Sequence, residues 1–360
     1  MNWISSSLGE ILPLQYGKSL PASKRIEGNI PVYSSAGSTG THNESLVSGP
    51  CLIVGRKGTV GSVYYEEHDC FPIDTAFYTT GTPEIDIRFG YYLLLHKRLS
   101  NYSQDSAVPG LNRDRYSEIP VLVPLLSEQR AIAEVLGALD DKIAANNKVI
   151  QLADSFTEAI AEKAFSSGKL VPLASIADIT MGNSPKGETL NELGDGVPFF
   201  QGIRDFGVRY PEVRVSTTAP TRFANELDTL FSVRAPVGTS NLAGFSCSIG
   251  RGISAFSSRT ETPYALFQAV RISKVWERYN AEGTVFGSIN RKQLEQSEIK
   301  WVDGSRLQEL ESTLSNVENI LHAATSMNTT LAATRDALLP QLMSGKMRVR
   351  EAEAVVEDVL

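Results

Sequence analysis

The chain has little of what metal enzymes and secreted proteins depend on. Its cysteines are an odd number without a close pair, so the sequence predicts neither a disulfide framework nor a zinc site. Its few histidines are scattered and lack metal-ligand spacing. The cysteines are Cys51, Cys70 and Cys247, and the histidines are His42, His68, His96 and His322.

Long apolar runs are also missing. No stretch approaches the roughly 20 residues that a membrane helix needs, and the start of the chain lacks the basic residues and apolar stretch of a signal peptide. Unpaired cysteines in a chain of ordinary hydrophobic content make the cytoplasm the expected location. A length of 360 residues favours two or more domains.

Motifs for catalysis or nucleotide binding are not found. The two Ser-Gly-Lys sequences, 167–169 and 344–346, are followed by Leu and Met where a phosphate-binding loop needs Ser or Thr. The Asp/Asn-Pro-Pro-aromatic tetrapeptide that amino-methyltransferases use to hold a flipped base does not occur. The basic, glycine-rich segment 55–61 is followed by residues typical of strands, so we interpret it as a hairpin loop rather than a dinucleotide fingerprint. The chain is therefore predicted not to be an enzyme.

What the chain does contain is a long internal repeat. Val108-Pro109-Gly110-Leu111-Asn112-Arg113 corresponds to Val285-Phe286-Gly287-Ser288-Ile289-Asn290-Arg291, and the two glycines are 177 residues apart. A long helical pattern follows each motif and stops at Gly168-Lys169 or Gly345-Lys346, again 177 residues apart. This period is far longer than the roughly 20–50 residues of a solenoid unit. It indicates a whole globular domain and a helix, copied once.

The globular copies match at scattered anchors and differ elsewhere. Gly17 corresponds to Gly182, Gly58-Thr59 to Gly238-Thr239, and segment 73–77 to segment 252–256. Two related domains with different surfaces favour two different targets. The alternative is a duplication kept only for stability, although packing alone does not require the same helix after each copy.

Two helices of about forty residues are predicted over 127–168 and 304–346. Apolar residues recur at helical spacing in both, Ser127 is a plausible N-cap, and the glycines at 168 and 345 are stop signals. A helix of roughly 55–60 Å would not stay folded with an apolar stripe exposed to water. The two helices are therefore expected to pack antiparallel on each other. An ordinary coiled-coil dimerisation element is the alternative.

The net charge of −7 is concentrated outside the globular copies. The first helix carries −3, the second −1 and residues 347–360 carry −2, which leaves −1 for the two copies together. A basic face on the copies is therefore compatible with the composition. The acidic C-terminal tail, 347–360, is expected to be solvated and disordered.

These features resemble a known family, the specificity (S) subunits of type I restriction–modification systems. The resemblance is carried by segment 119–124 running into Leu126-Ser127-Glu128-Gln129-Arg130-Ala131-Ile132-Ala133, by the Asn-Arg step upstream, and by the ending 338–346. The loop 55–61 with segment 72–75 also looks like a common target-recognition variant. The second copy departs from the pattern, because segment 299–303 replaces the proline-flanked segment and no Ser-Glu-Gln-Arg follows.

The resemblance implies an α+β fold with two similar target-recognition domains, 1–126 and 169–303, separated by two long antiparallel spacer helices in a pseudo-twofold internal repeat. Each domain would read half of a bipartite DNA target, and the helices would set the gap between the halves. Two modification subunits would bring S-adenosylmethionine and methylate adenine at N6. Two restriction subunits, with ATP and magnesium, would complete the complex. The chain itself would bind no cofactor and would have no membrane partner.

Candidate DNA contacts come from matched loops and steps of the repeat. Arginine, lysine, threonine and asparagine suit base edges and phosphates alike. A salt bridge or helix cap inside the domain is the alternative for the Asn-Arg steps. The candidates are Arg56, Lys57, Thr59, Asn112 and Arg113 in the first copy, and Arg234, Thr239, Asn241, Asn290 and Arg291 in the second.

Two other functions remain open at this stage. A specificity-like DNA-binding adaptor could serve another phage-defence system, which adjacent genes would reveal. A scaffold that joins proteins without binding DNA is the second, and a steep salt dependence of DNA affinity would exclude it.

Overall fold

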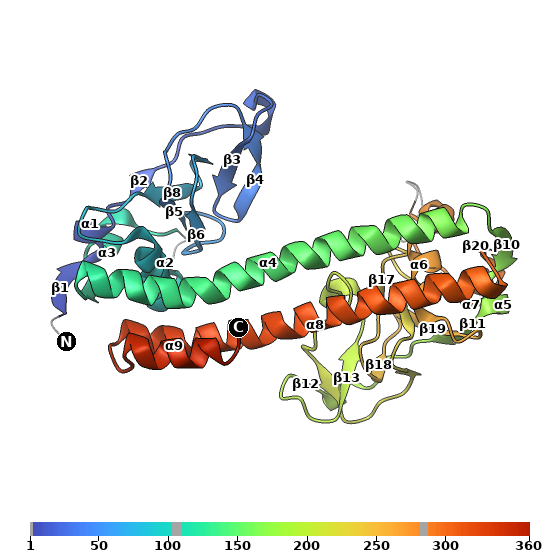
Figure 1. Ribbon diagram of the computed structural model, residues 1–360. Coiled ribbons are helices and arrows are strands. Elements are labelled where there is room, and N and C mark those ends of the chain that lie inside the picture. Colours follow the sequence, from blue (N-terminus) through green and yellow to red (C-terminus); the bar gives the residue numbers. More distant parts are fainter. Residues whose placement is uncertain (1–2, 103–109, 281–286) are drawn as a thin grey trace. The chain divides into compact units, whose positions relative to one another are not determined.

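The computed structural model describes residues 3–102, 110–280 and 287–360. Val108, Pro109, Val285 and Phe286 of the repeated motif lie outside the described residues. The chain divides into two compact units, Met1–Asn147 with Ser326–Leu360, and Lys148–Thr325. The division falls inside both long helices, α4 (Leu126–Phe165) and α8 (Gly304–Met343), so each unit holds one domain and half of each helix (Figure 1).

The first unit contains a sheet of order β2-β8-β5-β6, a sheet of order β4-β3-β7 and the ribbon β1-β9. Its strands are β1 (Ile4–Ser7), β2 (Gln15–Tyr16), β3 (Ile30–Ser34), β4 (Gly37–His42), β5 (Cys51–Gly55), β6 (Val63–Glu66), β7 (Phe71–Pro72), β8 (Ala76–Thr79) and β9 (Pro120–Val123). Its shorter helices are α1 (Leu8–Ile11), α2 (Ile87–Lys97), α3 (Arg113–Ser117) and α9 (Val349–Glu357).

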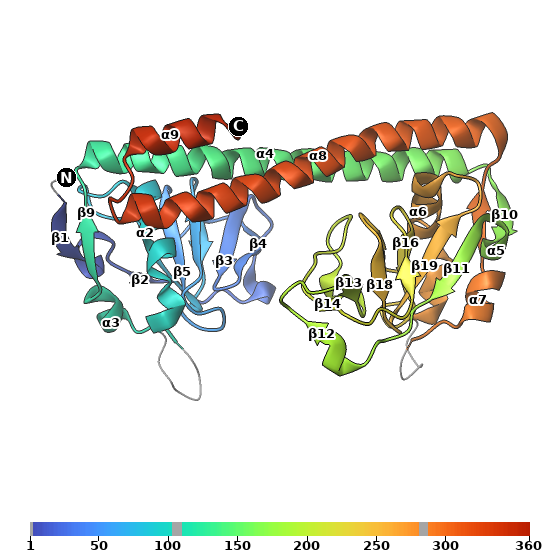
Figure 2. The ribbon, with the colours of Figure 1, turned by 90° about the horizontal axis from the view of Figure 1, so that it is seen from below.

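The second unit repeats this plan. A sheet of order β11-β19-β16-β17, a sheet of order β12-β14-β13-β18-β15 and the ribbon β10-β20 correspond to the three sheets above. Its strands are β10 (Lys169–Pro172), β11 (Ala177–Met181), β12 (Leu190–Asn191), β13 (Val197–Phe200), β14 (Ser216–Thr217), β15 (Phe223–Ala224), β16 (Thr229–Ser232), β17 (Ser240–Leu242), β18 (Cys247–Ile249), β19 (Ile253–Ser258) and β20 (Glu298–Trp301). Its shorter helices are α5 (Leu173–Ile176), α6 (Pro263–Arg271) and α7 (Arg291–Gln296), and Figure 2 shows α5 and α7 beside the ribbon. The predicted α+β class with two similar domains and two long helices is confirmed.

Backbone hydrogen bonds define the correspondence between the copies. Gly17 N donates to Ala76 O at 3.1 Å, and Gly182 N donates to Ile253 O at 2.9 Å. The match of Gly17 with Gly182 therefore agrees with the backbone. The same bonds pair Ala76 with Ile253, so the sequence match of segment 73–77 with 252–256 was shifted by two residues.

A second sequence match was also wrong. Gly238 corresponds to Gly61 rather than Gly58, because Gly61 N donates to Gly55 O and Gly238 N donates to Ser232 O. Both glycines have positive φ, 77° and 103°, and a Cβ at either would clash with a following helical turn. The sequence match relied on the Gly-Thr dipeptide. What both loops share is a glycine whose backbone lies close against a helical turn, where no side chain fits.

In the first unit the domain and the helices share one hydrophobic core. Leu136 and Leu139 of α4 pack with Leu331 and Leu338 of α8 and with buried side chains of the domain such as Tyr92. The interaction is antiparallel, since Arg335 on α8 pairs with Asp140 on α4 at 2.7 Å, while Asn328 accepts a hydrogen bond from Asn146 at 2.9 Å. The helices are therefore part of the unit's core and do not stand free.

The start of α4 and the C-terminal tail differ from the sequence expectation. Leu125 O accepts hydrogen bonds from Glu128 N and Gln129 N, so Ser127 lies inside the first turn and is not the N-cap. The tail is not disordered, because it forms α9, at whose start Arg348 N donates to the carboxylate of Glu351 at 3.0 Å. Ala352 and Val356 are buried in the core of the first unit, and this apolar face outweighs the acidic composition that suggested a solvated end.

In the second unit a buried charge cluster joins the domain to both long helices. Arg209, only 3% exposed, contacts Glu318 of α8 and pairs with Asp154 of α4 at 3.1 Å. Arg271 also pairs with Asp154. Burial raises the pKa of Asp154, but the hydrogen bonds and charges of Arg271 and Arg209 outweigh it and hold the pKa below its usual value. This contribution to stability is present above about pH 4 and is lost as the pH falls through the lowered pKa.

The helix ends of the second unit are also satisfied by this arrangement. The carboxylate of Glu311 on α8 accepts hydrogen bonds from Tyr264 N and Ala265 N, the free donors at the start of α6.

None of the helices in the described part of the chain combines the length and the apolar character required to span a bilayer.

We expect Glu318→Gln to lower the free energy of unfolding of the second unit by about 3 kcal/mol, because Arg209 would lose its closest carboxylate in a buried site. Glu309→Gln, an exposed position on the same helix, is the control and should change stability by less than about 0.5 kcal/mol. Thermal and denaturant unfolding measure both. Equal stabilities of the two variants would contradict a stabilising role for the cluster.

Candidate nucleic-acid interface

In the first unit four of the candidate residues line one polar hollow of about 260 Å³. The turn after β5 supplies Arg56 and Lys57, and the start of α3 supplies Asn112 and Arg113. A backbone bridge between Lys57 and Gly110, with Leu111 N donating to Arg56 O at 3.0 Å, joins the two segments. The sequence placed these residues in separate motifs more than fifty positions apart, and the fold brings them together.

Tyr16 stands between the two arginines. The guanidinium carbon of Arg56 lies 4.9 Å from the centre of its ring, and that of Arg113 lies 5.1 Å from the same centre. Arg56 also donates to Asp74 O at 3.1 Å. Because these contacts use the ring faces and a carbonyl, both guanidinium groups keep donors for a ligand. The arrangement suits a phosphate or the edge of a base.

The two asparagines of the repeated Asn-Arg step act as helix caps. Asn112 Oδ1 accepts from Asp114 N at 2.9 Å and Arg115 N at 3.0 Å at the start of α3. Asn290 forms a capping box with Gln293 at the start of α7. Both side-chain oxygens therefore act as helix caps, which was the alternative to a DNA contact. The side-chain NH2 groups are not used by these caps.

In the second unit the matching place is built differently. An isolated bridge joins Arg234 to Ser288, two residues before Asn290, so the exposed Arg234 lies next to the start of α7. Arg291 is exposed but pairs with Glu295 at 2.8 Å. By the backbone correspondence, Met181 and Val233 take the places of Tyr16 and Arg56. The second unit thus lacks the pair of arginines on one tyrosine ring at this place, although Arg278 lies 4.9 Å from the ring centre of Tyr279.

The threonines and the remaining asparagine are placed less favourably. Thr59 is exposed in the same loop as Lys57 but does not line the hollow, and the hydroxyl of Thr239 points to Pro236 O at 3.5 Å. Asn241 is 2% exposed, and its amide donates to Gly207 O and Ser240 O. The place of Asn241 in β17 directs its side chain into the domain, so the fold gives no support to the prediction of Asn241 as a DNA contact.

Two residues were missed at the sequence level. Tyr16 directly precedes the repeated Gly17 and is half exposed, which an aromatic beside an anchor glycine could have signalled. Arg251 occupies the position that matches Asp74, and it is exposed in the second unit. Its signal is the Arg-Gly step between the anchors Gly250 and Ile253.

Within the described residues no group of three or more His, Cys, Asp or Glu side chains is placed to hold a metal ion. The three cysteines are unpaired and buried. Burial raises the pKa of the Cys247 thiol to about 12, so this sulfur stays protonated and is a poor nucleophile.

Comparisons with known proteins agree with this picture. Residues 1–153 match the family model described as the type I restriction modification DNA specificity domain. The chain is 28% identical over 287 residues to a putative type I restriction enzyme MjaX specificity subunit of Methanocaldococcus jannaschii, covering 72% of this chain and 68% of that protein. It is also 28% identical over 140 residues to the EcoprrI specificity subunit of Escherichia coli, covering 37% of this chain and 35% of that protein.

A solved structure extends the likeness to the whole fold. The S subunit of a type I restriction–modification system from M. genitalium aligns with a TM-score of 0.67 at 17% identity, covering 95% of this chain and 96% of that one. Residues 1–153 thus match the type I restriction modification DNA specificity domain, and the chain as a whole shares the fold of this S subunit.

Proposed function

We propose that each domain reads one half of a bipartite DNA target, and that α4 and α8 set the unspecified gap between the halves. The observation that carries this is the contrast between a shared backbone and different side chains at one matched place. Tyr16 and Arg56 in the first unit are replaced by Met181 and Val233 in the second, beside the shared cations Lys57 and Arg234. A common backbone with different contact groups fits two different half-sites.

The partners in this proposal are two modification subunits and two restriction subunits. The modification subunits bring S-adenosylmethionine and methylate adenine at N6, and the restriction subunits use ATP and magnesium. Support comes from apolar side chains exposed on the long helices of the second unit, which a helical partner would cover. They are Val149, Leu152, Phe156 and Ile320.

The defining experiment is to express the chain with its neighbouring modification gene and map methylated adenines across the genome. We expect a split motif with two short, different halves, a fixed gap and one methylated adenine per half on opposite strands. A continuous motif would contradict the bipartite reading. If no methylation appears, DNA affinity measured against salt distinguishes an adaptor, with a steep slope, from a scaffold that does not bind DNA.

The role of the helices as a spacer has its own test. Four residues inserted near Ala145 of α4, with a matched insertion beside Asn328 of α8, add about 6 Å of helix. Since the rise per base pair is about 3.4 Å, the gap should lengthen by one or two base pairs while both halves stay unchanged. The methylation map measures this. An unchanged gap, or altered halves, would show that other parts of the complex set the spacing.

For Arg113 we expect a phosphate contact, because the matched Arg291 occurs beside a different set of side chains. Arg113→Ala should weaken binding to all sequences alike and reduce the salt slope by about 1. Arg115→Ala is the matched control, since Arg115 is exposed on the same helix but does not line the hollow. Fluorescence anisotropy with a panel of target variants measures both. A loss confined to one base pair would instead make Arg113 a base reader.

A further inference from the structure

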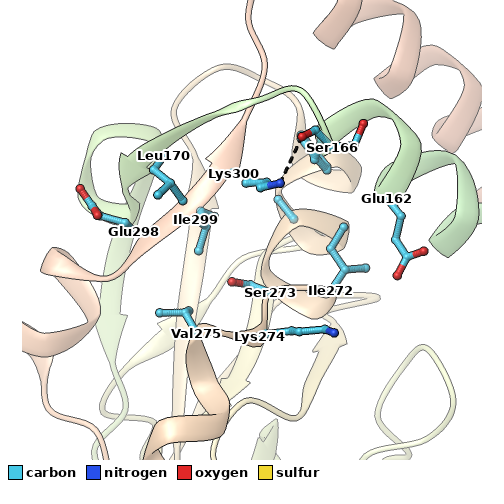
Figure 3. A pocket seen from close by; sticks show the side chains of 12 residues that line it. Glu162, Ser166, Leu170, Ile272, Ser273, Lys274, Val275, Glu298, Ile299 and Lys300 are labelled. Atoms are coloured by element: carbon cyan, nitrogen blue, oxygen red, sulfur yellow. Dashed lines mark hydrogen bonds between the residues drawn. The ribbon is translucent and has the colours of Figure 1, made fainter.

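Each unit carries a second hollow, next to its terminal ribbon. In the second unit a hollow of about 450 Å³ lies between the ribbon β10-β20, the end of α4 and the segment after α6 (Figure 3). In the first unit a hollow of about 390 Å³ lies between the ribbon β1-β9, the end of α8 and the end of α2. We call these the ribbon hollows. None of the candidate DNA residues lines either of them.

The ribbon hollows are the same place in the two copies. Ser5 pairs with Leu122 across one ribbon, and Leu170 pairs with Lys300 at the same register of the other. Most residues that line the first hollow have a counterpart lining the second. These matched pairs are Ser5 and Leu170, His96 and Ser273, Lys97 and Lys274, Pro120 and Glu298, Val121 and Ile299, Leu122 and Lys300, and Met343 and Ser166.

Both ribbon hollows have an apolar floor and an exposed aliphatic side chain on the ribbon. Val121 and Ile299 are buried at matched positions. Leu122 is 57% exposed in one ribbon, and Leu170 is 61% exposed in the other. An apolar hollow beside an exposed aliphatic residue is typical of a protein-docking surface. Each ribbon also consists of only its two described strands, so it has free edges to which an extended segment can add.

A lysine stands at the same point of each ribbon hollow. Lys97 Nζ donates to Pro120 O at 2.8 Å, and Lys274 is exposed. In the described parts of the chain, no carboxylate forms an ion pair with either ammonium group. The second hollow is also lined by Glu162 and Glu298, so the occupant that complements both hollows is a short segment with aliphatic side chains and a single carboxylate placed at the lysine.

The shared geometry also indicates how many occupants there are. The DNA-facing hollow exchanges its tyrosine and one arginine between the copies. The ribbon hollows keep their backbone walls, a buried Val121 or Ile299 and a lysine, although their other matched side chains differ. A ligand that occurs twice in identical form fits such a pair. We propose that the ribbon hollows bind one segment each from the two modification subunits. This inference rests on the proposed function, which supplies a partner present in two copies.

The test uses the full-length chain and its modification subunit, mixed at concentrations near the dissociation constant of the wild-type complex. Leu170→Glu and Leu122→Glu each place an acidic group at the apolar surface of one hollow, at a mostly exposed position. Mass photometry should show two modification subunits on the wild-type chain, one on either single variant and none on the double variant. Each affected site should bind at least tenfold more weakly.

Matched controls separate docking from folding. Val208→Glu and Ile26→Glu change side chains that are 65% and 59% exposed and lie outside both hollows, so they should keep two partners. Lys274→Ala and Lys97→Ala should weaken binding at their own hollow without altering the melting temperature. Wild-type-like stoichiometry and affinity in both Leu170→Glu and Leu122→Glu would overturn the inference and leave the proposed function intact. A wild-type chain that binds no modification subunit would instead refute the proposed partner.

Discussion

The burial of α4 against α8 is the interaction on which the rest of the structure depends. Neither helix could stay folded alone with an apolar stripe in water, and in each unit that stripe enters the same core as the neighbouring domain. Leu136 and Leu338 meet in the first unit, and Phe165 stacks on Trp301 in the second, with 5.6 Å between ring centres. Each domain is thereby fixed to its own half of the two helices.

Polar contacts within this packing determine register rather than add much stability. Asn146 donates to Asn328, and Asn328 donates to Asn147, both at 2.9 Å, where an apolar layer would tolerate sliding. In the second unit, the cluster of Arg209, Asp154 and Glu318 satisfies its charges only when the domain sits in one position. Such groups are costly when unpaired, so they select a single arrangement.

The two copies show how one backbone supports different surfaces. The turn after β5 and the turn after β16 share backbone hydrogen bonds and a glycine with positive φ, yet Arg56 and Val233 occupy the same place in them. The ribbons β1-β9 and β10-β20 likewise keep their register, while most of the side chains around them differ.

The sequence by itself determined the duplication and the two long helices, because both depend on local spacing and on motifs that can be recognised along the chain. It also singled out Arg56, Lys57 and Arg113, which the fold brings together around one hollow. Only the tertiary structure decided that Tyr16 lies between two of these arginines, that Asn241 is buried and that residues 349–357 form a helix. The physical reason is the same in each case: these outcomes depend on which distant segment packs alongside. Residue type alone does not reveal which face of α9 is buried or which segment packs against Asn241.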